Sequence, residues 1–359
     1  MTKILEIDEN NIDFEKIQLA ADVLKNGGLV VFPTETVYGL GAAAANQQAV
    51  KGIFQAKGRP SDNPLIVHVS NRKMIEELVK NPDVLNDDRV VKITDVFWPG
   101  PLTIIFEKSE AVCKEVCAGL DTVGIRMPEN KVALALIEEA GIGIAAPSAN
   151  TSGRPSPTRP EHVIEDMNGR VDIIISSGGC SVGVESTVLD MTSIPPTILR
   201  PGGVTRERLE QVLGERVQVS GEETKDLNIP KAPGMKYRHY APKGQMTVFD
   251  RGENLSDEKF AARMHSLLIQ ALQMNKKPIL LISSQLSMHF SNEYEKYIKI
   301  IGNLECKETF AEEIFAALRY CDECGAEVIL TEGISRDGIG DAVMNRLIKA
   351  SGRDCVIVE

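Results

Sequence analysis

Lys57 and Arg59 are the side chains in this sequence best suited to hold an anionic substrate. They stand two positions apart in the run KGRPSDN at residues 57–63, where glycine and proline constrain the chain. The planar guanidinium of arginine matches phosphate oxygens in pairs, and the lysine ammonium is a movable point charge. The run therefore predicts a site for substrates that carry phosphate or carboxylate groups. The same residues also suit an ordinary solvated turn, so this motif alone leaves both interpretations open.

Arg126 is a second candidate, because it ends the apolar run TVGIR at residues 122–126. An uncompensated charge at the end of a buried strand is costly. The arginine therefore requires an anionic partner. The sequence leaves open whether this partner is a protein acid or a ligand carboxylate.

Small polar residues follow several other predicted strands. They form AAPSAN at 145–150, SGRPS at 152–156, GVEST at 183–187 and LRPGG at 199–203. Small side chains allow backbone amides and hydroxyl groups to approach phosphates closely. Each run alone is more typical of a turn, but together they predict a basic, Ser/Thr-rich cleft on an otherwise acidic protein.

Common nucleotide-binding patterns are incomplete or missing from the sequence. The run GLGAAA at 39–44 fits the dinucleotide pattern GxGxxA, but TET at 34–36 separates it from the preceding strand. No acidic residue ends a second strand about twenty residues later, as ribose binding requires. The sequence also lacks GxxxxGK[ST], so neither an NAD-binding fold nor a P-loop is predicted.

Histidines and cysteines do not form a metal-binding pattern. His68 lies inside a predicted strand, where a single histidine is usually structural, but its position just after the cationic turn is equally compatible with ligand binding. Cys321 and Cys324 form a lone CxxC, which we interpret as two small residues at a helix end. With no HExxH and no Cys/His cluster in the sequence, we expect no protein-bound structural metal.

The composition limits the possible functions. The chain has 359 residues, 43% of them hydrophobic, and a formal net charge of −11. Such an acidic protein is poorly suited to grip nucleic acid over its whole surface, which requires many Lys and Arg contacts. The N-terminus has no signal-peptide pattern, no apolar run is long enough for a bilayer, and the seven scattered cysteines suit reduced thiols. We therefore expect a cytoplasmic protein without membrane contact.

The elements that must position these side chains alternate between helix and strand from residue 12 onward. Apolar spacing predicts helices at 17–25, 49–56, 73–80, 88–96 and 131–140. Short apolar runs predict strands at 29–32, 65–69, 102–107, 123–126, 142–146, 172–176, 186–190 and 197–200. Open α/β sheets place ligands at the ends of their strands, which is where the polar runs stand.

The segment from residue 221 to residue 244 contains three prolines and little apolar periodicity, so we interpret it as a linker. Beyond it, strands at 246–249, 278–283, 297–301, 328–331 and 355–358 alternate with helices at 258–274, 309–321 and 341–350. This alternation predicts a small parallel α/β sheet. The expected organisation is a catalytic domain at 1–218, a linker at 219–244 and a C-terminal domain at 245–359.

Four of these motifs, taken together, indicate a known family. They are PTETVYGL at 33–40, Lys57-x-Arg59, Ser148-x-Asn150 and GVEST at 183–187. The combination resembles the YrdC-like threonylcarbamoyl-AMP synthases, and APGMKYRHYAP at 232–242 resembles the linker of their long, two-domain form. The resemblance spans nearly the whole chain. It implies a YrdC-like twisted open α/β sheet, followed by a smaller Rossmann-like parallel α/β domain.

The resemblance implies a nucleotidyltransferase. The family forms L-threonylcarbamoyladenylate and pyrophosphate from L-threonine, bicarbonate or carbon dioxide, and ATP. The threonine amine becomes a carbamate, whose oxygen attacks the α-phosphate, so the step needs positioning and charge neutralisation more than a covalent nucleophile. Magnesium is expected to ride on the ATP phosphates with few protein ligands. The product serves the threonylcarbamoyl modification of the adenosine beside the tRNA anticodon, so the enzymes that transfer it to tRNA are expected partners.

The resemblance also implies roles for individual residues. Lys57 and Arg59 are the expected catalytic residues. The expected ATP-binding residues are Arg59, Asn63, Thr122, Ser148, Asn150, Ser156, Arg200 and Tyr237. The expected threonine-binding residues are Thr36, His68, Arg126, Ser186 and, through its backbone, Ala146. The sequence does not identify a general base.

Two questions stay open. The first is whether Tyr237 and its basic neighbours close over the nucleotide as a lid or whether the linker is an ordinary tether. The alternative function is an RNA-binding or regulatory module that uses the same cleft for phosphate backbones. The net charge of −11 argues against that function, and direct tRNA contact is expected to be weak at most.

Overall fold

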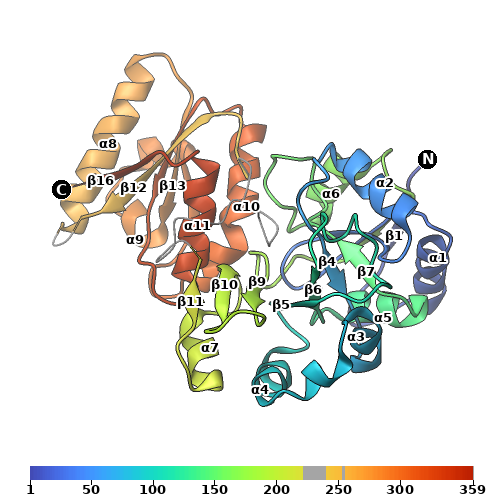
Figure 1. Ribbon diagram of the computed structural model, residues 1–359. Coiled ribbons are helices and arrows are strands. Elements are labelled where there is room, and N and C mark those ends of the chain that lie inside the picture. The colour runs from blue at the N-terminus through green and yellow to red at the C-terminus, as the bar shows by residue number, and fades with distance from the viewer. Residues whose placement is uncertain (221–239, 253–254, 359) are drawn as a thin grey trace. The chain divides into compact units, whose positions relative to one another are not determined.

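Two compact units make up the chain. The computed structural model describes residues 1–220, 240–252 and 255–358, so most of the predicted linker at 219–244 lies outside the described residues. The first unit comprises Met1–Ser152 and Ser156–Tyr237, and the second comprises Gly153–Pro155 and Arg238–Glu359. Each unit is built on its own sheet with helices packed against it (Figure 1).

The first unit contains an eleven-stranded sheet with the order β1-β8-β2-β3-β7-β4-β6-β5-β9-β10-β11. Its strands are β1 (Lys3–Glu6), β2 (Val30–Phe32), β3 (Gly39–Ala43), β4 (Ile66–His68), β5 (Leu102–Glu107), β6 (Thr122–Arg126), β7 (Ile144–Ala146), β8 (Ile173–Ser176), β9 (Thr187–Asp190), β10 (Thr197–Arg200) and β11 (Gln218–Val219). The sheet is mixed: β4 and β6 pair in parallel, whereas β3 runs antiparallel to both of its neighbours. It is the open α/β sheet that the sequence predicts.

Helices of the first unit contribute to two separate hydrophobic cores. The helices are α1 (Phe14–Lys25), α2 (Gln47–Lys57), α3 (Arg72–Leu78), α4 (Asp88–Phe97), α5 (Lys131–Ala140), α6 (Pro160–Met167) and α7 (Arg206–Leu213), with a 3₁₀ turn η1 (Pro82–Asn86). One core holds α1 and α5 together with Val30 and Phe32, and the other holds α2, α4, α6 and α7 together with Val31. Alternate residues of β2 thus reach opposite faces, as the period of a strand requires.

Helix α2 fixes the start of the cationic turn because both of its ends are capped. At the N-terminus the Asn46 side chain accepts hydrogen bonds from the N–H groups of Gln48 and Ala49. At the C-terminus Gly58 adopts a φ of 62°, a conformation that suits glycine and ends the helix at Lys57. The chain then passes through residues 58–65 to β4.

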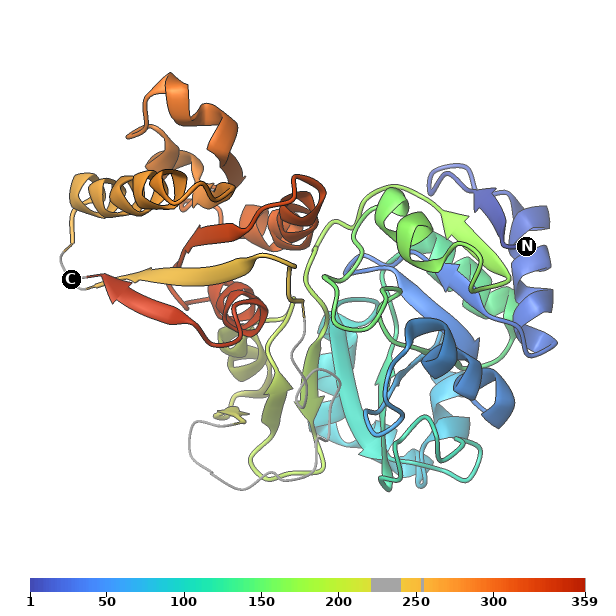
Figure 2. The same ribbon diagram turned by 90° about the horizontal axis from the view of Figure 1, so that it is seen from above.

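The second unit contains a five-stranded sheet with the order β14-β13-β15-β12-β16, and every strand pair in it is parallel. Its elements are β12 (Gln245–Arg251), α8 (Asp257–Gln273), β13 (Pro278–Ser283), α9 (Ser284–Ser287), η2 (Asn292–Tyr297), β14 (Ile298–Gly302), α10 (Glu308–Glu323), β15 (Val328–Glu332), α11 (Gly340–Ala350) and β16 (Cys355–Val358). Helices cover both faces of this sheet (Figure 2). The predicted small parallel α/β sheet is therefore confirmed.

The predicted helices and strands are present with ends that agree within three residues. The elements that the sequence did not indicate in the first unit are β1, β3, β11, α6, α7 and the 3₁₀ turn η1. Strand β3, with the sequence GLGAA, has no β-branched or aromatic residue that would favour a strand. Helices α6 and α7 span eight residues each, and each buries only a few apolar side chains.

Candidate functional site

His68 and Arg126 lie side by side at the ends of two parallel strands. The register of β4 and β6 pairs His68 with Arg126, so both residues stand at carboxyl ends of the sheet, where open α/β sheets bind ligands. Both side chains are buried, with exposed fractions of 5% and 3%. Two of the residues predicted to bind threonine are thus brought together.

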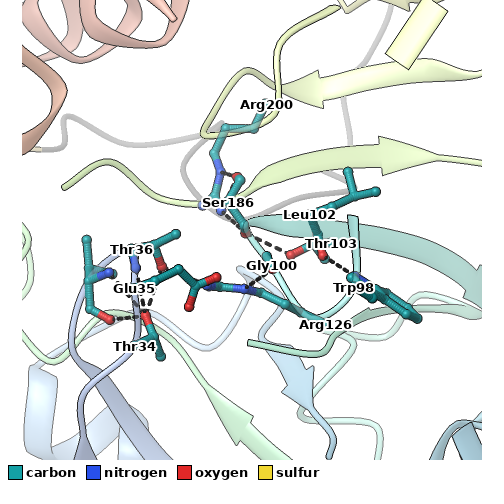
Figure 3. Close-up of polar contacts among 11 residues, drawn as sticks. Thr34, Glu35, Thr36, Trp98, Gly100, Leu102, Thr103, Arg126, Ser186 and Arg200 are labelled. Carbon is teal, nitrogen blue, oxygen red and sulfur yellow. Dashed lines mark hydrogen bonds and ion pairs between the residues drawn. The ribbon is translucent and has the colours of Figure 1, made fainter. Parts of the chain in front are cut away.

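Arg126 bonds to three acceptors of the first unit (Figure 3). Its Nη2 donates to Glu35 Oε1 at 2.5 Å, its Nη1 to Thr36 Oγ1 at 2.9 Å and its Nε to the Gly100 carbonyl at 3.3 Å. A protein acid therefore lies against this arginine, as one of the two partners left open by the sequence. Since the Glu35 side chain is only 6% exposed, the two residues form a buried ion pair.

The turn at residues 34–37 holds Glu35 and Thr36 in place against Arg126. Thr34 Oγ1 donates to the Val37 carbonyl at 2.6 Å and accepts from the N–H groups of Thr36 and Val37 at 3.2 Å each. A threonine hydroxyl that bonds to nearby backbone groups stabilises a turn in this way. The Glu35 carbonyl also accepts from the Val182 N–H at 2.7 Å, which ties the turn to the segment before β9.

Ser186 links Arg200 to the interior of the sheet (Figure 3). Its carbonyl accepts from Arg200 Nη2 at 2.9 Å and Nε at 3.2 Å. Its Oγ lies 2.8 Å from Thr103 Oγ1. Since both Ser186 and Arg200 are buried, this arginine offers its charge from a fixed position rather than from a solvated surface.

Lys57 is held by the polar run at 148–150. Its ammonium donates to the carbonyls of Ser148 and Asn150, the second at 2.6 Å, and to Asn150 Oδ1 at 3.2 Å. Ser148 Oγ in turn lies 2.5 Å from Asn150 Oδ1. The structure thus joins two motifs that are about ninety residues apart and that the sequence assigned to one phosphate site.

Arg59 folds back on its own turn and bonds to the backbone there. Its Nη2 donates to the carbonyls of Asn63 and Pro64, at 3.1 and 3.2 Å. Asn63 is buried, with an exposed fraction of 1%. The bonds close the turn between α2 and β4 and bring Arg59 and Asn63 together.

The remaining predicted residues lie at different places in the first unit. Ser156 is fully buried, and its Oγ donates to Glu185 Oε1 at 2.8 Å. Thr122 begins β6 and Arg126 ends it, so the two lie on one face of the sheet, about 13 Å apart along the strand. Ala146 ends β7 opposite Ile66, two residues before the polar run that holds Lys57.

Burial sets the protonation states of two groups in the site. Burial first, and the Arg126 guanidinium second, lower the pKa of His68 to about 3, so its imidazole is neutral at physiological pH. The ring stands edge-on to Phe32 with a centroid distance of 5.7 Å. Burial first, and the Glu35 carboxylate second, raise the pKa of the Cys180 thiol, so it stays protonated.

Comparison with known proteins assigns the chain to a family. A family model described as Telomere recombination, which groups Sua5, YciO and YrdC, matches residues 22–202. A model of the threonylcarbamoyl-AMP synthase C-terminal domain matches residues 204–352. The chain is 44% identical over 353 residues to threonylcarbamoyl-AMP synthase from Pyrococcus abyssi, with 98% of both chains covered. The chain belongs to the family of threonylcarbamoyl-AMP synthases.

Two further relatives show that the likeness to the family extends over both units. Threonylcarbamoyl-AMP synthase from Bacillus subtilis is 41% identical over 346 residues, which cover 96% of this chain and 95% of the relative. The crystal structure of Sua5 from Pyrococcus abyssi complexed with L-threonine is 43% identical, covers both chains completely and superimposes with a TM-score of 0.90. The resemblance to the long, two-domain form of the family is therefore confirmed.

The GxGxxA pattern of this chain lies mostly in strand β3 and not at a turn from a strand into a helix. Gly39–Ala43 is a strand between β2 and β7 and does not turn into a helix. A Cβ atom on Gly41 would lie 2.7 Å from Ile144 Cγ2 and 2.8 Å from Phe32 Cε1. The glycine is required by close packing inside the sheet.

Several residues of the site were not assigned a role from the sequence. Glu35, Thr103 and Glu185 contact Arg126, Ser186 and Ser156 respectively. Glu35 and Glu185 both stand inside motifs that carry the resemblance to the family. The sequence indicated that Arg126 needs an anionic partner. Only the folded turn shows that this partner is Glu35.

The remaining predictions concern Tyr237, metal binding, membrane contact and the CxxC pair. Tyr237, predicted to bind ATP, lies outside the described residues. Within 1–220, 240–252 and 255–358, no three or more His, Cys, Asp or Glu side chains gather as a metal site would require. No helix among the described residues is long and apolar enough to cross a membrane. Cys321 is buried near the end of α10 and Cys324 follows it, as predicted for two small residues at a helix end.

Proposed function

We propose that this chain is an L-threonylcarbamoyladenylate synthase, which converts L-threonine, bicarbonate and ATP to L-threonylcarbamoyladenylate and pyrophosphate. The observation that carries the proposal is the likeness over both units to threonylcarbamoyl-AMP synthases. One of these relatives has been crystallised complexed with L-threonine. A nucleotidyltransferase of this kind accounts for both an amino-acid site and a phosphate site in one unit.

The amino acid would bind where β4 and β6 end. Of the five N–H donors of a guanidinium, Arg126 uses three on Glu35, Thr36 and Gly100, which leaves one on each terminal nitrogen for a carboxylate. Neutral His68 and the hydroxyl of Thr36 would contact the remaining polar groups of threonine, together with Ser186 and the Ala146 backbone. Because these groups are buried and held by other bonds, they would bind the amino acid with little loss of conformational entropy.

ATP would bind with its phosphates between the turn at 57–63 and the run at 148–150. Lys57 bonds to the run at 148–150 and so fixes that loop in place. The same ammonium would neutralise the charge of the phosphates. Arg59 and Asn63 would extend this surface, and buried Arg200 would add a second cation. Thr122, Ser148, Asn150 and Ser156 are proposed to complete the nucleotide site.

The reaction would need no covalent bond to the enzyme. A carbamate oxygen of N-carboxythreonine attacks the α-phosphorus, the bond to the β-phosphate oxygen breaks, and pyrophosphate leaves. Negative charge on the phosphates is the main obstacle, so cations in fixed positions would account for most of the acceleration. We propose that Mg²⁺ enters with ATP as part of the substrate. The phosphate oxygens would bind the ion, so it would need no dedicated set of protein ligands.

Threonine-dependent release of pyrophosphate tests the proposed function. The full-length protein is incubated with ATP, labelled bicarbonate and L-threonine, and pyrophosphate and labelled adenylate are measured. We expect both products only when threonine is present. ATP consumption that ignores threonine, or RNA binding without turnover, would refute the proposal. We further propose that the adenylate passes to tRNA-modifying enzymes in the cytoplasm.

A further inference from the structure

One oxygen of the buried Glu35 carboxylate is not used by the protein. Oε1 accepts from Arg126 Nη2 at 2.5 Å, whereas Oε2 is buried and has no hydrogen-bond partner in the part of the chain that the structure describes. A buried carboxylate oxygen without a donor is costly, so native proteins rarely contain one without a functional reason. Glu35 is therefore more than a counter-ion for Arg126.

The pair as a whole has unused capacity on both of its charges. Among the described residues, Arg126 retains one free N–H on each terminal nitrogen, and Glu35 retains one free oxygen. A purely structural buried pair gains stability only when its remaining donors and acceptors are satisfied. An α-amino acid carries a carboxylate and an ammonium on one carbon, which is the complement of this arrangement.

We propose that Glu35 binds the α-ammonium group of L-threonine through Oε2 and takes its proton, while Arg126 holds the carboxylate. This inference rests on the proposed function and supplies the proton acceptor that the sequence does not identify. An ammonium group has no lone pair, so it must lose a proton before its nitrogen can attack a carbon atom. A carboxylate within hydrogen-bond reach is a suitable acceptor for that proton.

The proton and electron balance can be written with bicarbonate as co-substrate. One ammonium proton moves to Glu35 Oε2, and the freed lone pair forms a C–N bond to the bicarbonate carbon. The C–OH bond breaks, and the departing hydroxide takes a second nitrogen proton and leaves as water. The products are the carbamate anion and protonated Glu35, which no longer repels the carbamate and donates a hydrogen bond to it. Glu35 returns its proton to solvent before the next turnover.

Charged and titratable groups around Glu35 come from several elements. Arg126 of β6 bonds to Glu35, and Cys180 of the segment after β8 interacts with it electrostatically. His68 of β4 is paired with Arg126, and Glu185, bonded to Ser156, belongs to the segment before β9. Burial lowers the pKa of His68 and raises the pKa of Cys180, so both groups are neutral at physiological pH. These two groups therefore do not contribute to a change of pH dependence when Glu35 is substituted.

The pH dependence of E35Q tests the proposal. Near pH 7 we expect kcat/KM for threonine to fall about 100-fold, a typical loss for a general base. Because E35Q can use only threonine that is already deprotonated, the deficit should shrink about tenfold per pH unit up to the pKa of the substrate ammonium. The matched control is T36V, which removes a bond to Arg126 but keeps the acid. T36V should lower kcat/KM and leave the wild-type pH profile unchanged.

A measurement on the wild-type protein supports the test if E35Q does not fold. 3-Hydroxybutyrate matches threonine but lacks the amine, and we expect it to bind at least tenfold more weakly, because it leaves Glu35 Oε2 unpaired. Equal affinity for both ligands, or a deficit of E35Q that is the same at every pH, would overturn the role of Glu35. Absence of threonine-dependent pyrophosphate release by the wild-type protein would instead overturn the proposed function.

Discussion

A single buried guanidinium organises the amino-acid end of the site. Arg126 reaches Glu35, Thr36 and Gly100 through three different nitrogens, and only a planar, branched cation has donors in these directions. A lysine at this position could neutralise Glu35 but could not also hold a substrate carboxylate with two parallel hydrogen bonds. The geometry of the side chain, and not only its charge, is therefore required.

The substitution R126K tests this requirement. We expect KM for threonine to rise about 10- to 100-fold, because one hydrogen bond to a charged group contributes about 1.5–3 kcal/mol. The dissociation constant of ATP, measured by calorimetry without threonine, should change less than about twofold. R72K is the matched control, since Arg72 begins α3 and its side chain is 51% exposed. Loss of ATP affinity in R126K, with threonine binding intact, would contradict the assignment.

Lys57 stabilises the run at 148–150, and we propose that the same ammonium also neutralises phosphate charge. Its ammonium satisfies the carbonyls of Ser148 and Asn150, and the side chain is only 2% exposed. K57M keeps the aliphatic stem but removes the hydrogen bonds from the ammonium to these carbonyls. We expect the free energy of unfolding to fall by about 2 kcal/mol and ATP binding to weaken about tenfold or more.

Thermal unfolding and nucleotide titration measure the two effects of K57M. K51M is the control on the same helix, because the Lys51 side chain is 47% exposed and its ion pair is with Glu115, away from the run at 148–150. It should change neither quantity appreciably. A K57M protein with wild-type ATP affinity would show that Lys57 serves the loop alone.

The sequence indicated the residues of the site better than their contacts. It required an anion for Arg126 on energetic grounds, and Glu35 meets that requirement. It did not show that Lys57 bonds to Ser148 and Asn150, because side-chain bonds between distant segments leave no periodic pattern. The assignments to ATP and threonine remain predictions that substitutions must test.

At the scale of elements, β3 shows why strand prediction from residue propensities can fail. Its residues are Gly, Leu and Ala, which do not favour strands, yet they occupy a central strand. Small residues are required there because Phe32 and Ile144 fill the space on one side. Longer elements were predictable, since α1, α2 and α5 bury one apolar face each at helical spacing.

The substitution G41A tests the packing argument for β3. The added Cβ would lie 2.7 Å from Ile144 and 2.8 Å from Phe32, so one of these side chains must move. We expect the free energy of unfolding to fall by about 1–3 kcal/mol, as for other overpacked cores. In G178A the new Cβ meets no atom within 4 Å, so this control should unfold like wild type. Equal stability of both variants would show that the sheet relaxes without cost.

At the scale of the whole molecule, net charge separates the proposed enzyme from an RNA-binding module. The formal charge of −11 repels a polyanion over long distances, whereas ATP needs only a few local cations such as Lys57, Arg59 and Arg200. Non-specific binding of nucleic acid depends on many phosphate contacts and has a Kd of about 10⁻⁴ to 10⁻⁶ M even for suitably charged proteins. The sequence therefore predicts a protein that binds nucleotides well and tRNA poorly.

Titration of the full-length protein with tRNA tests this prediction. At physiological salt we expect a Kd weaker than about 10 μM, measured by fluorescence anisotropy. Saturating ATP and threonine should leave it unchanged, and threonine-dependent pyrophosphate release should be insensitive to added tRNA. A sub-micromolar Kd that weakens steeply with salt and is abolished by ATP would place RNA phosphates in the nucleotide site. That outcome would favour the RNA-binding function, because one set of cations cannot hold a polynucleotide tightly and remain available to ATP.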